Sequence, residues 1–100
     1  MIKHIVMWRL KDNAHGNDSM TNAIRIKDKL EALRDTIPGI AALEVGIDYS
    51  RSDSSSDVLL YSEFEDKDAL NNYQKHPDHQ ALIPFIVEAV AERRLVDYEK

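Results

Sequence analysis

The chain has 100 residues, which is the size of a single domain. Its formal net charge of −5 argues against nucleic-acid binding, because contact with phosphates needs a basic face, and no apolar run is long enough to span a bilayer. The chain has no cysteine, and Met1 leads directly into an apolar pattern without the cleavage region of a signal peptide, so a cytoplasmic location is expected.

Residues 2–11 alternate in the manner of a β-strand. One predicted face carries Ile2, His4, Val6, Trp8 and Leu10, and the other carries Lys3, Ile5, Met7 and Arg9. Both faces hold large apolar side chains, so both are expected to be at least partly covered. The polar segment 12–17 contains a glycine and is predicted to be a loop.

Residues 18–36 are predicted to form a helix. Apolar side chains recur there at helical spacing, at Ile24, Ile26, Leu30, Leu33 and Ile37. Asp18 or Ser19 is expected to cap the beginning of the helix, and Pro38-Gly39 is expected to stop it.

Two further strands are predicted at residues 40–49 and 58–65. The first strand has Ala41, Leu43, Val45, Ile47 and Tyr49 on one face, and the second has Val58, Leu60, Ser62 and Phe64. The connection at residues 50–57 is rich in Ser and Asp, and it is expected to be the most mobile loop of the chain.

A second helical region follows these strands. Asp66 is expected to cap a short helix that ends near Tyr73. Pro77 is expected to open a further helical segment over residues 78–90, and Pro84 is expected to break or kink it.

Residues 93–98 predict a last strand, so the order of elements is β-α-β-β-α-β. This order is typical of the ferredoxin-like α+β fold, in which a four-stranded antiparallel sheet carries its helices on one face. The bare face would expose Ile5, Met7, Leu59 and Tyr61. A second copy of the chain is the simplest cover, so a homodimer is expected.

The segment from Tyr73 to His79 places a phenol and two imidazoles within seven residues. These are the clustered side chains able to transfer protons near neutral pH. Pro77 interrupts the helix between Tyr73 and His79, which allows both side chains to approach the sheet. A neutral His79 can accept a proton from an activated carbon while the Tyr73 phenol binds the developing enolate oxygen. The alternative is that His79 is a structural residue at the start of a helix.

The other histidines have simpler interpretations. His4 shares a face with Val6 and Trp8, so it is either a satisfied core residue or part of a cavity wall. His76 precedes a proline and is interpreted as structural, and His15 is expected to be solvated.

The sequence does not predict a metal or cofactor site. His76 and His79 are spaced like metal ligands, but no cysteine or second histidine pair supports them. Trp8, Tyr49 and Tyr61 are aromatic residues at strand spacing, which is more typical of a core than of a haem or flavin site.

Three blocks of the sequence are found together in one known family. They are Lys3–Lys11, Ile37-Pro38-Gly39-Ile40 followed by Glu44-Val45-Gly46, and Tyr73-x-x-His76-Pro77-x-His79 followed by Asp97-Tyr98. In this combination and order the chain resembles the stress-responsive A/B barrel (Dabb) family of the dimeric α/β-barrel superfamily. The resemblance implies a homodimer whose two sheets pack into a barrel, with a cavity in each subunit between the sheet and its helices.

The resemblance also suggests residue roles. Most family members have no assigned activity, but a plant polyketide cyclase of this type catalyses an intramolecular aldol condensation with a Tyr and a His of this motif. By motif position these residues are Tyr73 and His79 here, with His4 on the facing strand.

Three hypotheses for function follow. The leading one is a protein that binds a small apolar or carbonyl-containing ligand, with a cavity lined by His4, Val6, Trp8, Leu60, Phe64, Tyr73, His79 and Leu82. The second is a cofactor-free cyclase, isomerase or oxygenase that uses His79 as base and Tyr73 as oxyanion donor. The third is a structural stress protein whose interior is filled by bulky side chains such as Trp8 and Phe85.

Overall fold

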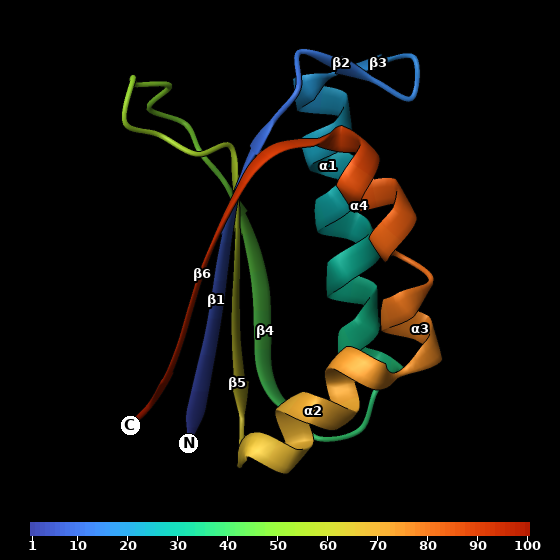
Figure 1. The fold of residues 1–100 in the computed structure, drawn as a ribbon, viewed down its shortest axis with the longest axis vertical. Helices are drawn as coiled ribbons and strands as arrows, with labels where there is room; N and C mark the ends of the chain where they lie inside the picture. The colour runs from blue at the N-terminus through green and yellow to red at the C-terminus, as the bar shows by residue number, and fades with distance from the viewer.

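The sheet and the helices form two layers in the computed structural model, which describes residues 1–100 (Figure 1). The four-stranded sheet has the order β4-β5-β1-β6, and its neighbouring strands are all antiparallel. Its strands are β1 (Ile2–Leu10), β4 (Ile40–Ile47), β5 (Val58–Phe64) and β6 (Val90–Glu99). This arrangement confirms the predicted ferredoxin-like α+β fold.

The helical layer lies on one face of the sheet (Figure 1). It consists of α1 (Ser19–Glu31), the 3₁₀ turn η1 (Ala32–Asp35), α2 (Lys67–Lys75), α3 (Pro77–Gln80) and α4 (Ile83–Ala89). The region predicted as one segment over 78–90 is therefore two helices, and each has a proline in its first turn. Pro84 starts a helix rather than bending one, because its missing N–H is not needed there. None of these helices has the length and apolar composition that crossing a bilayer requires.

Helix α1 begins at the predicted cap. The Asp18 carboxylate accepts a hydrogen bond from the Thr21 N–H at 2.8 Å. The helix buries Ala23, Ile26 and Leu30 against the sheet. Ile24, which was assigned to the same stripe, is 47% exposed, because its neighbour Ala23 occupies the inward phase of the helix.

The predicted loop at residues 12–17 contains a short hairpin of β2 (Asn13–Ala14) and β3 (Asn17–Asp18). His15 lies at its turn with a φ of 56°. His15 is exposed, as expected, but it also contacts α4: its ring stacks on Phe85 at a centroid distance of 4.1 Å, and its Nε2 lies 2.9 Å from the Phe85 carbonyl oxygen. Through His15, the hairpin therefore packs against α4.

The predicted alternation of β1 is present in the structure. Its helix-facing side chains are buried, and they are Ile2, His4, Val6, Trp8 and Leu10. The alternation predicted for the next strand ends at Ile47, and Tyr49 lies beyond the strand with 95% of its surface exposed.

The open face of the sheet has no helix over it (Figure 1). Register places Ile5 beside Tyr61 on β5 and Val96 on β6, and Met7 beside Leu59. These side chains are partly or largely exposed, so the chain presents an uncovered apolar surface.

Candidate functional site

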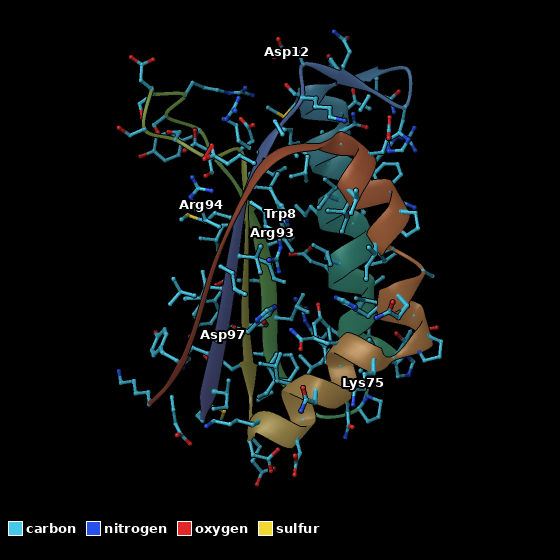
Figure 2. All side chains as sticks on the ribbon, viewed as in Figure 1. Trp8, Asp12, Lys75, Arg93, Arg94 and Asp97 are labelled. Atoms are coloured by element: carbon cyan, nitrogen blue, oxygen red, sulfur yellow. The ribbon has the colours of Figure 1, made fainter.

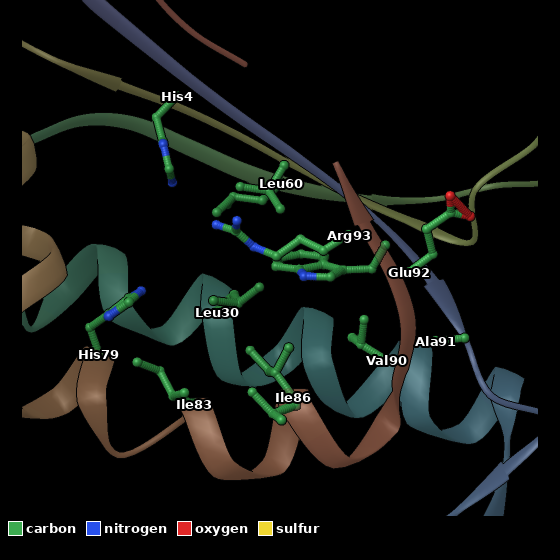
Figure 3. A pocket seen from close by; sticks show the side chains of 13 residues that line it. His4, Leu30, Leu60, His79, Ile83, Ile86, Val90, Ala91, Glu92 and Arg93 are labelled. Atoms are coloured by element: carbon green, nitrogen blue, oxygen red, sulfur yellow. The ribbon is translucent and has the colours of Figure 1, made fainter. Parts of the chain in front are cut away.

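A cavity of about 510 Å³ lies between the covered face of the sheet and the helices α3 and α4 (Figure 3). Nine of its 13 lining residues are hydrophobic, and the full set is His4, Val6, Trp8, Leu30, Leu60, His79, Ile83, Ile86, Val87, Val90, Ala91, Glu92 and Arg93. The interior therefore holds open space, which argues against a structural protein filled by its own side chains.

His4 stands on the sheet wall of the cavity (Figure 3). Its Nδ1 lies 2.5 Å from a carboxylate oxygen of Asp97, the residue that register places beside it on β6. A carboxylate accepts the hydrogen bond from Nδ1–H, so this contact orients the ring and leaves Nε2 free of that partner. His4 is thus both a hydrogen-bonded core residue and part of the cavity wall.

His79 stands on the helical wall, opposite His4, with its ring directed into the cavity (Figure 3). Its Nδ1 is buried and makes no well-formed hydrogen bond. Burial lowers the pKa of His79; the neighbouring Gln74 carbonyl opposes this shift, while His4 and Arg93 add to it. The ring is therefore neutral at neutral pH and can accept a proton.

Tyr73 is fully buried on α2 and is absent from the cavity lining. Its ring centroid lies 4.6 Å from that of His79 and 6.3 Å from that of His4, so it packs against both imidazoles. Its hydroxyl has no hydrogen-bond partner, and burial raises the pKa of Tyr73 to about 12. The phenol therefore stays protonated near neutral pH, and its hydroxyl is a hydrogen-bond donor without an acceptor, buried behind the residues that line the cavity.

Two other residues expected in the lining also lie outside it. Phe64 is fully buried, and its ring centroid is 5.1 Å from that of Tyr73. Leu82 precedes α4 and packs against the core. Both contribute to the packing behind the cavity, whereas His4, Val6, Trp8, Leu60 and His79 lie on its surface.

The helical wall contains residues that sequence reasoning missed. They are Ile83, Ile86 and Val87 on α4, and Val90 continues this apolar surface at the start of β6. Their spacing of three, one and three residues is an apolar helical stripe, so a signal was present in the sequence. The prediction for residues 78–90 placed Ile86 in an apolar stripe with Leu82, Phe85 and Ala89 or Val90, but it assigned only Leu82 to the cavity.

Arg93 was also missed, although it extends from β6 into the cavity (Figure 3). Figure 2 shows Arg93 and Arg94 on opposite sides of this strand, as strand alternation requires. Register places Arg93 beside Trp8 and Asp97 beside His4, so both β6 residues belong to the cavity side. Two polar residues at even spacing in the last strand were the available signal.

No three potential metal ligands come together in the structure. His76 is instead the cap of α3, and its Nδ1 accepts a hydrogen bond from the Asp78 N–H at 3.0 Å. This contact gives His76 a structural explanation.

Comparisons with known proteins agree with this architecture. The chain matches the family model of the stress responsive A/B barrel domain, Dabb, over residues 2–100. A dimeric protein of unknown function with a ferredoxin-like fold from Bacteroides fragilis is 32% identical, with a TM-score of 0.87 over 99% of this chain and 95% of that one. No curated protein matches the chain significantly.

Two further solved structures widen the comparison. A Dabb family protein from Mesorhizobium loti is 27% identical, with a TM-score of 0.75 and coverage of 99% of this chain and 95% of that one. A hydroxynitrile lyase from Passiflora edulis is 16% identical, with a TM-score of 0.80 and coverage of 97% and 90%, which shows a shared fold alone. By its sequence match over nearly its full length, this chain belongs to the Dabb family.

Proposed function

We propose that the protein binds a small, mainly apolar ligand in the cavity between its sheet and its helices. The observation that carries this proposal is the open space of about 510 Å³ with walls that are mostly hydrophobic. Small-molecule sites typically enclose about 300–1,000 Å³ and combine apolar walls with a few placed polar groups. Here those groups are His4, His79, Glu92 and Arg93.

Binding can be followed without a label, because Trp8 is the single tryptophan of the chain and lines the cavity. We expect a small apolar ketone such as 2-tetralone to change Trp8 fluorescence saturably. Replacement Ile86→Phe adds volume to the cavity wall and should weaken this binding about tenfold or more. The matched control Ile24→Phe makes the same exchange at an exposed position and should bind as the original protein does. Equal affinities for all three proteins would contradict a ligand in this cavity.

A second candidate function is a cofactor-free reaction at a carbon next to a carbonyl. The neutral His79 ring favours it, because a base with a lowered pKa remains unprotonated near neutral pH. In this proposal His79 accepts the proton and the protonated Tyr73 phenol donates to the enolate oxygen. This role requires the Tyr73 hydroxyl to contact the substrate, although Tyr73 lies behind the residues that line the cavity.

Proton exchange tests this reaction directly. We expect the protein in deuterium oxide to speed the exchange of the α-protons of 2-tetralone, as followed by NMR. Replacement His79→Ala should abolish the acceleration, and Tyr73→Phe should reduce it. Exchange at the buffer rate with the unaltered protein would remove the enzymatic candidate and leave ligand binding in place.

The same family membership supports a homodimer. The Bacteroides fragilis relative is described as dimeric, and the open sheet face of this chain carries exposed apolar side chains such as Met7 and Val96. We propose that two copies pack these faces against each other, because burial of such a surface provides the driving force for association.

A further inference from the structure

The cavity carries one positive charge that no acidic side chain of the chain pairs with. His4 is engaged by Asp97, and His79 is kept neutral by burial. Glu92, the one acidic residue in the cavity lining, pairs with Arg94 and lies 3.5 Å from Arg9. Arg93 forms no ion pair in the structure, so its guanidinium charge remains available.

The position of Arg93 suits contact with a ligand head group. The residue lies on the cavity side of the edge strand β6, where register places it beside Trp8. Its side chain extends inward toward Leu60 (Figure 3). Arg93 as a whole is an exposed residue, so a ligand can approach it from solvent. A ligand body seated against the apolar helical wall would therefore place its polar end within reach of the guanidinium.

We propose that the ligand is an apolar molecule with a carboxylate, and that Arg93 binds this carboxylate. This inference rests on the proposed ligand-binding function and names its chemical class. A guanidinium donates two parallel hydrogen bonds to a carboxylate, and this bidentate contact is stronger than a contact with a neutral group. Because burial lowers the pKa of the nearby His79, its ring carries no positive charge near neutral pH, and Arg93 is the group in the cavity that attracts an anion.

Two probes that differ in charge but hardly in shape test the proposal. Octanoate carries the carboxylate and octanamide replaces it with a neutral amide. With Trp8 fluorescence as the readout, octanoate should bind the unaltered protein about tenfold or more tightly than octanamide. Arg93→Gln should remove this preference by weakening octanoate far more than octanamide, and Arg93→Lys should retain part of it.

Arg94→Gln is the matched control, because it removes the same charge from the opposite side of the same strand. It should retain the full preference for octanoate. A preference that Arg94→Gln removes as completely as Arg93→Gln would reflect overall charge and would overturn the proposal. Equal binding of the two probes to the unaltered protein would overturn the carboxylate class alone. Failure of both probes and of 2-tetralone to bind would overturn the binding function as well.

Discussion

The two faces of the sheet are built from the same strands but are completed in different ways. On the covered face, helices bury Val6, Leu60 and Phe64 almost fully, and they leave a cavity beside β6. On the open face, Met7 and Val96 remain 39% and 57% exposed. Alternation in one set of strands thus produces two apolar surfaces. The helices of the same chain cover one of them, and the other remains uncovered in the single chain.

The polar groups of the two faces differ as well. On the open face, the ammonium of Lys3 lies 3.0 Å from the carboxylate of Glu63, and the Tyr61 hydroxyl donates to the same carboxylate at 2.6 Å. On the covered face, Tyr73 and His79 each bury a polar atom without a partner. These charged and polar groups of the open face are therefore paired with one another, whereas the covered side has unpaired hydrogen-bonding groups beside the cavity.

The largest expected effect on stability comes from a substitution in the core, which lies against the covered face of the sheet. Phe64→Ala should lower the free energy of unfolding by about 3–5 kcal/mol, because it removes a fully buried ring and leaves a void. Urea denaturation measures this change. The control Tyr49→Ala removes an aromatic ring that is 95% exposed and should change stability by less than about 0.5 kcal/mol. Similar losses in the two variants would mean that the core is misassigned.

The next effect sharpens the interpretation of the open face. Ile5→Glu places a carboxylate at the centre of the proposed dimer contact, so the dimer Kd should rise by about tenfold or more while the fold persists. Light scattering with circular dichroism separates these two outcomes. The control Val87→Glu adds the same charge to the helical layer, where the side chain is 65% exposed, and should leave the dimer intact. If the unaltered chain is monomeric at micromolar concentration, the open face is not a dimer contact and this interpretation is contradicted.

A smaller effect follows from the buried imidazole. Burial lowers the pKa of His79 below its value of about 6.5 in the unfolded chain. As the pH falls below 6.5, the unfolded chain takes up this proton before the folded chain does, so the free energy of unfolding decreases; above 6.5 this contribution is fully present. Urea denaturation at pH 7.5 and 5.5 measures the slope.

A variant pair identifies the source of that slope. His79→Gln should flatten it, because the titrating group is gone. His76→Gln removes a nearby histidine that caps α3, so it should lower stability while the slope persists. The assignment to His79 fails if the slope is unchanged in His79→Gln.

The smallest effect is expected in the loop at residues 50–57, outside both faces. Insertion of Gly-Ser between Asp53 and Ser54 should cost less than about 1 kcal/mol, because lengthening a surface loop adds little closure entropy. The contact between the hydroxyls of Ser52 and Ser55 at 3.0 Å lies within the loop, whereas Asp57 at its end bonds to the backbone of Trp8 and Leu10, so the insertion site lies away from these anchoring contacts. Fast hydrogen exchange should identify it as the most mobile loop, and slow exchange throughout it would count against this prediction.

Insertion of the same two residues between Leu60 and Tyr61 provides the contrast. There the added length disturbs the pairing of β5 with both of its neighbours, so folding should fail. Equal tolerance at the two sites would contradict the register of the sheet.

Local patterns predicted the fold well, because strand alternation and helix caps depend on residues that are near in sequence. The buried series from Ile2 to Leu10 and the cap at Asp18 are examples. The assignment of Ile24 was wrong because a helix segment with apolar residues at adjacent positions has more than one plausible inward phase, and contact with the sheet selects one.

The site was less accessible to sequence reasoning. The pairing of His4 with Asp97 and the entry of Arg93 beside Trp8 depend on the register between the first and last strands, which local patterns do not specify. The place of Tyr73 behind the wall depends on how α2 and α3 meet at Pro77. Sequence reasoning therefore named residues that lie at or beside the cavity, but their division into cavity surface and supporting layer required the tertiary structure.

The central place of β1 has a consequence for the order in which the protein assembles. β1 pairs with β5 and β6, and β4 pairs with β5, so neither of the first two long strands has a sheet partner until residues 58–64 have been synthesised. Contacts between such distant segments impose a large loop-closure entropy and slow the search for the native arrangement. During synthesis on the ribosome, β1 therefore remains without a strand partner, and we expect its exposed apolar side chains in that interval to favour chaperone binding and aggregation.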